Sequence, residues 1–185
     1  MLRLDWQLLY EGPVTKFHNE KLLEETLDWL HSHNYVVINL DCSPETTPAR
    51  IVKSIGETLH FPDYFSGNII DSFDDFLYRV EIRFNGGLAI ALRHFDRVLV
   101  SEPILSWQIL NTLANHSRRN LIFGLCLIVL VQSDNPKIEI EPVGIRTVSW
   151  NQREWMDFQR GIGEAPEWWS NSDWQVSSLS NPEDL

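Results

Sequence analysis

The chain has 185 residues, of which 43% are hydrophobic and 22% are charged, values typical of a folded globular protein and not of a disordered one. Its formal net charge of −11 argues against binding to nucleic acids or anionic membranes. The same charge favours a cationic protein partner, although it can also serve solubility alone. The length suits one domain with appendages and a sizeable core.

The cysteines and the termini add little to these limits. Cys42 and Cys126 lie far apart near predicted strands, which predicts buried free thiols and neither a disulfide framework nor a zinc site. Residues 1–6 show no apolar core and no small-residue cleavage pattern, so we expect no signal peptide. The longest apolar run, 121–131, is too short to span a membrane. We therefore expect a soluble, cytoplasmic protein.

The first half of the chain predicts a helix, a strand and a second helix. Leucines at helical spacing predict an amphipathic helix over 17–33. The β-branched run at 35–40 predicts a strand covered on both faces. Thr47 followed by Pro48 predicts the N-cap and first turn of the next helix, which Pro62 ends.

The middle of the chain predicts another helix and a buried strand. Asn68 predicts an N-cap, with Asp71 at the third helical position in the manner of a capping box. The apolar positions of this helix that we expect to face the core are Ile70, Phe73, Leu77 and Val80. Alternation at 80–84 and the turn at 85–87 leave room for a hairpin, before a buried strand at 88–92.

The remaining elements complete an α/β pattern. Ser101 and Pro103 predict the start of a helix that runs to about Arg119, and the run 121–131 predicts the last strong strand. The order strand, helix, helix, strand, helix, strand predicts an α/β fold with a small three-stranded parallel sheet and right-handed crossovers. Alternation within 134–150 leaves open either an added strand or a segment that wraps the surface.

The predicted helix that begins after Asn68 carries an unusual set of acids. Like charges three or four residues apart destabilise a helix by roughly 0.2–0.5 kcal/mol per pair. Only Asp71 lies near enough to the helix N-terminus to gain from its dipole, so Asp74 and Asp75 have no local stabilising reason to be acids. They form either a solvated polar face or, with the acidic and aromatic loop 63–65, a negative docking patch.

The segment 61–77 holds a specific motif. An apolar residue, proline, an acid, tyrosine and a second aromatic residue precede glycine and asparagine, and an acidic helix follows. This motif and the strand patterns on both sides of it resemble the barstar family, over residues 35–133. The resemblance implies a barstar-like α/β fold over these residues. Outside it we expect an extension with a helix at 1–34, a packed extension at 134–163 and an acidic tail at 164–185, whose tryptophans either pack on the domain or form a second binding element.

The resemblance also implies a function. Members of the family inhibit secreted bacterial ribonucleases of the barnase type, so it implies an intracellular bacterial immunity protein that blocks the active site of a basic ribonuclease or related toxin. In the family the loop and helix enter the ribonuclease cleft, and an Asp mimics substrate phosphate. Aligned without gaps, Asp74 falls on that Asp. The other expected contact residues are Tyr64, Phe65, Gly67, Asn68, Asp71, Phe73 and Asp75. We expect no enzymatic activity, no cofactor, no metal and no contact with nucleic acid or membrane.

Three features depart from the family pattern. Ser66 separates the two aromatic residues from Gly67, where family members place glycine directly after them. Ile70 takes a position that usually holds an acid that contributes to binding, and the helix around 111–115 offers no carboxylate where a second contact acid is expected. Two alternatives stay open, which are a module of the same fold that binds a different basic protein and a metal-dependent hydrolase with the helix carboxylates as ligands.

The histidines predict no site. His31 and His33 end a predicted helix, where they suit the negative end of its dipole better than a metal ion. His60, His94 and His116 are isolated, and no serine or cysteine motif accompanies them. The sequence alone therefore predicts a docking helix and no catalytic residue.

Overall fold

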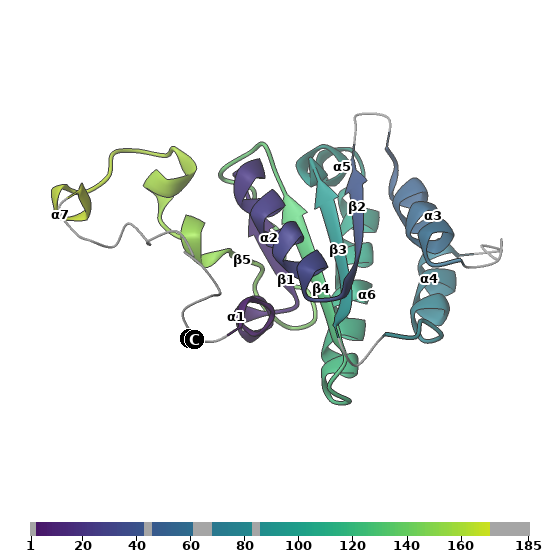
Figure 1. Ribbon diagram of the computed structural model, residues 1–185. Coiled ribbons are helices and arrows are strands. Elements are labelled where there is room, and N and C mark those ends of the chain that lie inside the picture. Colours follow the sequence, from purple (N-terminus) through teal and green to yellow (C-terminus); the bar gives the residue numbers. More distant parts are fainter. Residues whose placement is uncertain (1–2, 43–45, 61–67, 83–85, 171–185) are drawn as a thin grey trace.

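The computed structural model describes residues 3–42, 46–60, 68–82 and 86–170. A parallel β-sheet lies between two layers of helices (Figure 1). Its strands are β1 (Val14–Phe17), β2 (Tyr35–Asp41), β3 (Gly87–Arg93), β4 (Cys126–Gln132) and β5 (Ser149–Trp150). The α-helices are α1 (Leu4–Glu11), α2 (Glu20–Ser32), α3 (Pro48–Thr58), α4 (Ile69–Leu77), α5 (Phe95–Ser101), α6 (Pro103–Leu121) and α7 (Glu167–Ser170), and two 3-10 helices cover Gln152–Glu154 and Asp157–Arg160. The expected α/β class is confirmed.

The sheet is larger than the sequence predicts. It has five strands in the order β2-β3-β4-β1-β5, all of them parallel. The expectation of a three-stranded sheet is therefore wrong. The three predicted strands are the adjacent β2, β3 and β4, and the chain on either side of them supplies β1 and β5. These two strands have only four and two residues, too few to show a strand period in the sequence.

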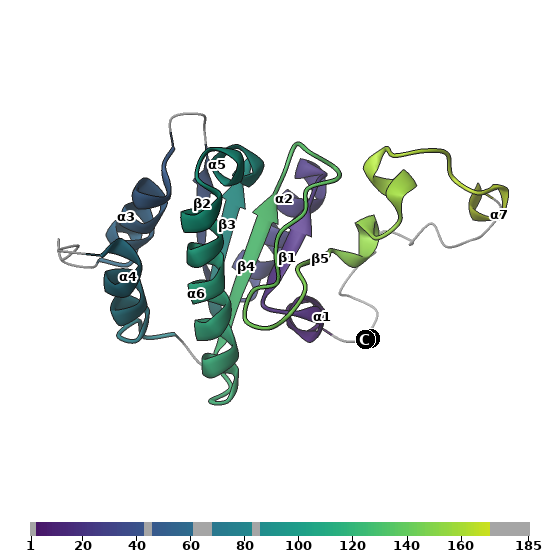
Figure 2. The same ribbon diagram turned by 180° about the vertical axis from the view of Figure 1, so that it is seen from behind.

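The two faces of the sheet carry different helices. In Figures 1 and 2, α1 and α2 cover one face, and α3, α4 and α6 cover the other. Alternate residues of β3 follow this division, because Ala89 and Ala91 belong to the cluster under α1 and α2 while Ile90 and Leu92 belong to the cluster under α4 and α6. The helix predicted over 17–33 is α2, which buries Leu23, Leu27 and Leu30.

Only two of the three predicted strands are covered on both faces. In β3 and β4 nearly every residue is buried. β2 lies at the edge of the sheet and leaves Val36 39% exposed, so the prediction that residues 35–40 are covered on both faces is wrong. A β-branched run fits an edge strand as well as a central one, and the sequence does not separate the two.

Two predicted helix starts, at Thr47 and Asn68, are confirmed, whereas the helix expected from residue 17 begins at Glu20 because Phe17 lies in β1. Thr47 Oγ1 accepts a hydrogen bond from the Arg50 N–H at 3.3 Å and caps α3. Asn68 Oδ1 accepts one from the Ile70 N–H at 3.0 Å and caps α4. Pro103 begins α6, but Ser101 is instead the last residue of the unexpected helix α5.

Two predicted boundaries are corrected. α6 continues to Leu121, and Gly124, with a φ of 72°, lies in the turn before β4, so the strand begins at Cys126 and not at 121. β3 begins at Gly87 and pairs in parallel with β2 and β4, so it is not an arm of a hairpin. A Cβ at Gly87 would lie 2.4 Å from the Cys126 carbonyl oxygen and from the Tyr35 ring, which excludes any larger residue there.

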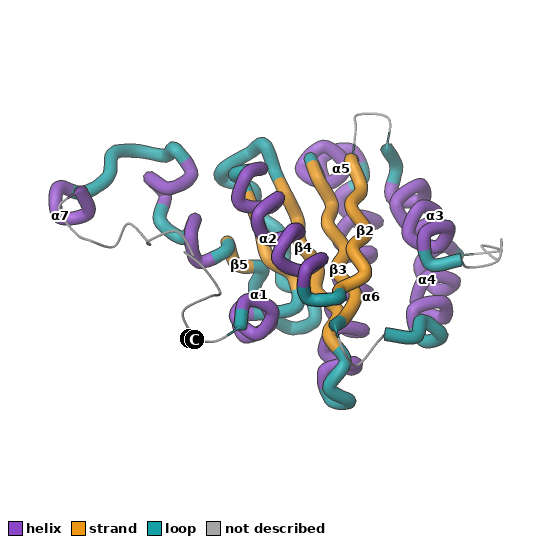
Figure 3. The backbone as a smooth tube through the Cα atoms, viewed as in Figure 1, coloured by secondary structure: helices purple, strands orange, loops and turns teal. Residues whose placement is uncertain are grey.

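The chain after β4 wraps the sheet without forming a long strand (Figure 3). Ile138 and Ile140 are buried in the core, and the short β5 then pairs with β1. Near the end of the described chain, the Trp169 ring lies 4.8 Å from that of Phe158, so at least one tryptophan of the tail packs back on the extension. Trp174 lies outside the described residues.

Two further expectations concern the cysteines and membranes. Cys42 and Cys126 are buried free thiols, as predicted. Burial, with the nearby charges of Asp41 and Asp96, raises the pKa of Cys42 to about 12. Within the ranges that the structure describes, none of the helices combines the length and the apolar character needed to cross a membrane.

Candidate functional site

Helix α4 presents one apolar side and one acidic side. Phe73, Phe76 and Leu77 are spaced three and four residues apart and are at most 4% exposed, so they fix this helix on the core. Ile70 and Val80 are partly buried against the same core, as the sequence predicts. The opposite side of α4 faces solvent and carries the acids.

Phe73 is not available to a partner in this structure. Its exposure is 0%, which confirms that it faces the core. Its place among the expected contact residues is not supported, because exposing a buried aromatic side chain costs about 1.5–3 kcal/mol. The loop residues Tyr64, Phe65 and Gly67 lie outside the described residues, and of the loop's contact set Asn68 alone is described.

Asp74 has a structural partner that the sequence does not reveal. Its Oδ1 lies 2.8 Å from Nε2 of His116, a residue of α6 that is only 3% exposed. A buried imidazole that loses its hydrogen-bond partner costs about 1–3 kcal/mol. The interpretation that Asp74 has no local reason to be an acid is therefore wrong. The Asp74 side chain nevertheless remains 45% exposed.

The contact between Asp74 and His116 extends into an aromatic group. The Tyr78 ring meets the His116 ring edge-on at 4.6 Å between centroids, and the Arg119 guanidinium lies 3.9 Å from the centroid of Tyr78. Tyr78 is 55% exposed. The C-terminal end of α4 is thus joined to α6 by a cation–π contact and a hydrogen bond, beside an exposed aromatic ring of the kind found in interfaces.

Asp71 and Asp75 are the free acids of α4. Both are exposed, and their spacing of four residues places them on the same side of the helix. In the described part of the chain, no hydrogen bond or ion pair involves either carboxylate. The two charges repel each other, and among the described residues no cation offsets this cost, although Asp71 gains from its place in the first turn of the helix.

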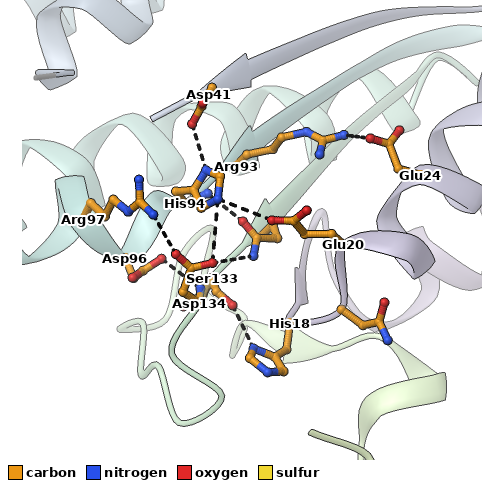
Figure 4. A network of polar contacts seen from close by, with 12 residues as sticks. His18, Glu20, Glu24, Asp41, Arg93, His94, Asp96, Arg97, Ser133 and Asp134 are labelled. Carbon is orange, nitrogen blue, oxygen red and sulfur yellow. Dashed lines mark hydrogen bonds and ion pairs between the residues drawn. The ribbon is translucent and has the colours of Figure 1, made fainter. Parts of the chain in front are cut away.

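A second polar group lies at the carboxyl ends of the strands (Figure 4). His94, which stands alone in the sequence, lies within hydrogen-bond or ion-pair distance of Asp41, Glu20 and Asp134. Arg97 donates to Asp134 Oδ2 at 2.9 Å. Burial opposes the ionisation of Asp134, but hydrogen bonds from Gln132 and Arg97 and the charges of His94 and Arg97 outweigh it and lower the pKa of Asp134.

Sequence reasoning missed this group, although a signal for it exists. Glu20, Asp41, His94 and Asp134 each stand at or just beyond the end of a strand, and carboxyl ends of parallel strands share one edge of a sheet. The residues are far apart along the chain, so no spacing motif joins them. Without β1, which the sequence does not predict, Glu20 has no strand to follow.

A third polar region is a cavity of about 360 Å³ beside β1 and the C-terminal extension. Lys16 and Arg160 both lie over the Trp150 ring, 4.7 and 4.6 Å from its centroid. Burial and the charge of Arg160 lower the pKa of Lys16. Lys16 donates to the Ile138 carbonyl, and Arg160 is bonded to backbone carbonyls and to Asp157, so these cations fasten the extension to the sheet.

No model of a known protein family matches the chain, and a search of curated proteins finds no match. Function is therefore inferred from the contacts and charges of the chain itself. The two surfaces from which function is inferred are the acidic side of α4 and the group around His94.

Proposed function

We propose that the protein is a barstar-like inhibitor that binds a basic bacterial ribonuclease through α4 and blocks its active site without performing chemistry. The observation that carries the proposal is a pair of exposed carboxylates, Asp71 and Asp75, which have no partner among the described residues and lie on a helix whose other side is fixed in the core. Carboxylates held in this way accept charge-assisted hydrogen bonds from the Arg and Lys side chains of a phosphate-binding cleft.

The order of the elements supports this proposal. Between residues 35 and 132 the chain runs strand, helix, helix, strand, helix, helix, strand, and its three strands are adjacent and parallel. This is the order that the resemblance implies, with α5 as an added short helix. In Figures 1 and 2, β5 and α7 lie at the opposite end of the molecule from α3 and α4, so these additions leave the acidic side of α4 open.

The ungapped pairing with the family pattern puts Phe73 among the contact residues, but Phe73 is buried. Its burial therefore supports a pairing that is shifted by one residue. In the ungapped pairing the first contact acid is replaced by Ile70, and the phosphate-mimicking Asp, four residues later, is Asp74. Ile70 is partly buried and Asp74 is bonded to His116. A shift by one residue brings Asp71 and Asp75 to these two positions instead. We therefore assign the phosphate-mimicking role to Asp75 and the second contact to Asp71.

The alternatives use the same surface or the same acids. A different basic protein would bind the same side of α4, and the experiment below separates that case. A hydrolase built on the α4 acids has little support, because Asp74 is engaged by His116. Among the described residues, the group of side chains close enough to hold a metal ion lies around His94 and includes no acid of α4.

The proposal is tested by RNA hydrolysis with small basic ribonucleases of the barnase type, in the presence of stoichiometric protein. Wild type should inhibit, and Asp75→Ala should weaken inhibition by roughly 30-fold or more, because truncating one partner of a buried charge pair costs about 2–5 kcal/mol. Asp28→Ala is the matched control, since Asp28 is an exposed helix acid on α2, over the other face of the sheet.

Each outcome of this assay decides a separate point. Failure of wild type to inhibit any such ribonuclease removes the inhibitor proposal and leaves binding to another basic protein. An equal loss in Asp28→Ala and Asp75→Ala excludes α4 as the docking surface. A larger loss in Asp74→Ala than in Asp75→Ala restores the ungapped pairing.

Association should also depend on salt. Exposed carboxylates steer a basic partner through long-range attraction, which is screened beyond about 8 Å at physiological ionic strength. The association rate constant with an inhibited ribonuclease should therefore fall by tenfold or more between low and physiological salt, as stopped-flow fluorescence would measure. A rate independent of salt would exclude electrostatic docking.

A further inference from the structure

The residues that follow four parallel strands meet at one edge of the sheet. Glu20 follows β1, Asp41 ends β2, His94 follows β3 and Asp134 follows β4, at the end toward which the strand arrows point (Figures 1 and 4). The chain leaves β1 toward the α2 face and leaves β3 toward the α6 face. Open α/β sheets bind ligands at carboxyl ends where connections diverge in this way.

The His94 ring is held with Nε2 between two carboxylates. Its Nδ1 lies 2.8 Å from Asp41 Oδ1, and because an ionised carboxylate only accepts hydrogen bonds, Nδ1 carries the proton of this bond. Nε2 lies 3.4 Å from Glu20 Oε1 and 3.7 Å from Asp134 Oδ1. A carboxylate on the far nitrogen is the arrangement that fixes the tautomer of metal-binding histidines and leaves a lone pair on Nε2.

The separations suit a single small ion. Zinc binds histidine nitrogen and carboxylate oxygen at about 2.0–2.2 Å, so the ligand atoms of a tetrahedral site lie about 3.3–3.5 Å apart. The distance from His94 to Glu20 has this value, and the distance from His94 to Asp134 exceeds it slightly. The ligand atoms of all three side chains lie within 4.8 Å of one another, so small side-chain rotations complete the geometry.

Neighbouring contacts hold the ligands in place. The backbone N–H of His94 donates to Gln132 Oε1 at 2.7 Å, and Gln132 Nε2 donates to Asp134 Oδ1 at 3.2 Å. Arg97 holds the other oxygen of Asp134 at 2.9 Å. These contacts join the ends of β3 and β4 and orient both ligands before any ion arrives.

Charge and access at this edge favour a cation. Three carboxylates surround His94, whereas Arg97 is the one guanidinium in the described chain that is bonded to any of them. The side chains of Glu20 and Asp134 are 56% and 46% exposed. An ion can therefore reach the ligands from solvent, and water can complete its coordination.

We propose that His94 Nε2, Glu20 and Asp134 bind a divalent transition-metal ion, zinc first, and that Asp41 is a positioning residue that orients the imidazole. One nitrogen and two carboxylate oxygens are donors that suit zinc, whereas calcium and magnesium take oxygen ligands alone. The competing explanation is a permanent ion-pair clamp in which His94 is protonated and no metal binds.

The test is a titration of the full chain with zinc after metal has been removed with a chelator. Competition with a chromophoric chelator should show one zinc ion per chain. His94→Gln should lower the affinity at least tenfold, and Asp41→Asn, which keeps all three ligands, should lower it 10- to 100-fold. His31→Gln, at an exposed histidine near the end of α2, is the control and should bind as wild type does.

Two results would overturn the proposal. One is the absence of stoichiometric zinc binding by wild type. The other is an equal zinc affinity in wild type and His94→Gln. Asp134→Asn tests a second ligand in the same way, and circular dichroism shows that each variant is folded. If His94 forms an ion-pair clamp that binds no metal, His94→Gln and Asp134→Asn should lower the melting temperature by the same amount with and without zinc. No ribonuclease enters this experiment, so its result is separate from that of the inhibition assay.

Discussion

The two acidic regions of the molecule differ in what holds their carboxylates. On α4, Asp71 and Asp75 come from one helix, and their carboxylates form no hydrogen bond or ion pair with the described residues. At the carboxyl edge of the sheet, Asp41 ends β2 and Asp134 follows β4, and each is bound to a neighbouring side chain. The first pair is free to follow the side chains of a large partner, whereas hydrogen bonds within the chain hold the side chains of the second group close to one another.

This difference separates two kinds of recognition. A protein partner brings long, flexible cations that adapt to free carboxylates and gain from their field at a distance. A metal ion binds at short, defined distances and therefore favours ligands that already lie close to their bound positions. The acids of α4 therefore suit docking, and the group around His94 suits coordination.

The largest expected effect concerns the side of α4 that faces the core. Phe73→Ala removes a ring with 0% exposure and should destabilise the protein by about 3–5 kcal/mol, measured by urea unfolding. Asp75→Ala, two residues away on the exposed side, should change stability by less than about 0.5 kcal/mol. Equal effects of the two variants would contradict the division of α4 into a fixed side and a free side.

A smaller effect should separate Asp74 from its neighbours. Asp74→Ala leaves the buried His116 without its hydrogen-bond partner and should cost about 1–3 kcal/mol. A double-mutant cycle with His116→Ala measures the coupling between the two side chains. Additive losses would show that Asp74 is as free as Asp75, and the α4 acids would then form a single docking patch.

The stability of the protein should fall at alkaline pH because of Cys42, the buried thiol directly after β2. Burial raises the pKa of Cys42 to about 12, above its value of about 8.5 in an unfolded chain, so the folded state binds more protons between these values. Stability is then complete below about pH 8 and falls as the pH rises toward 12, by up to about 1.4 kcal/mol per pH unit. Urea unfolding at pH 7.5, 9 and 10 should show this slope in wild type and a flatter one in Cys42→Ala. Identical slopes would remove the assignment to Cys42.

The smallest effect concerns repulsion between the free acids. Asp75→Asn removes a like-charge pair at i,i+4 and should stabilise the protein by about 0.2–0.5 kcal/mol at low salt, with no gain in 1 M salt. Urea midpoints at the two salt concentrations measure this difference. A loss of stability would show that Asp75 has a stabilising partner in solution, and would weaken its assignment to docking.

Local signals explain what the sequence reveals of this fold. The caps at Thr47 and Asn68 act within a few residues, and the side of α4 that holds Phe73 follows from helical spacing alone. The runs in β3 and β4 are long enough to show burial on both faces. These features are confirmed because their causes lie inside short windows of the chain.

Long-range pairing explains what the sequence does not reveal. β1 is too short to show a period and exists because it pairs with β4 and β5. The bond between Asp74 and His116 depends on the packing of α4 against α6, and the group around His94 depends on four strands that end at one edge. Each of these contacts joins residues that only the folded chain brings together.

The place of β1 in the sheet also has a consequence for how the chain is made. Val14 pairs with Val129, so β1 leaves the ribosome well before its neighbour β4 has been synthesised. β2 and β3 can pair long before that, and closing so large a loop is slow. During synthesis both edges of β1 therefore stay unpaired until β4 and β5 have been made, and we expect chaperones to bind the nascent chain around β1 during this interval.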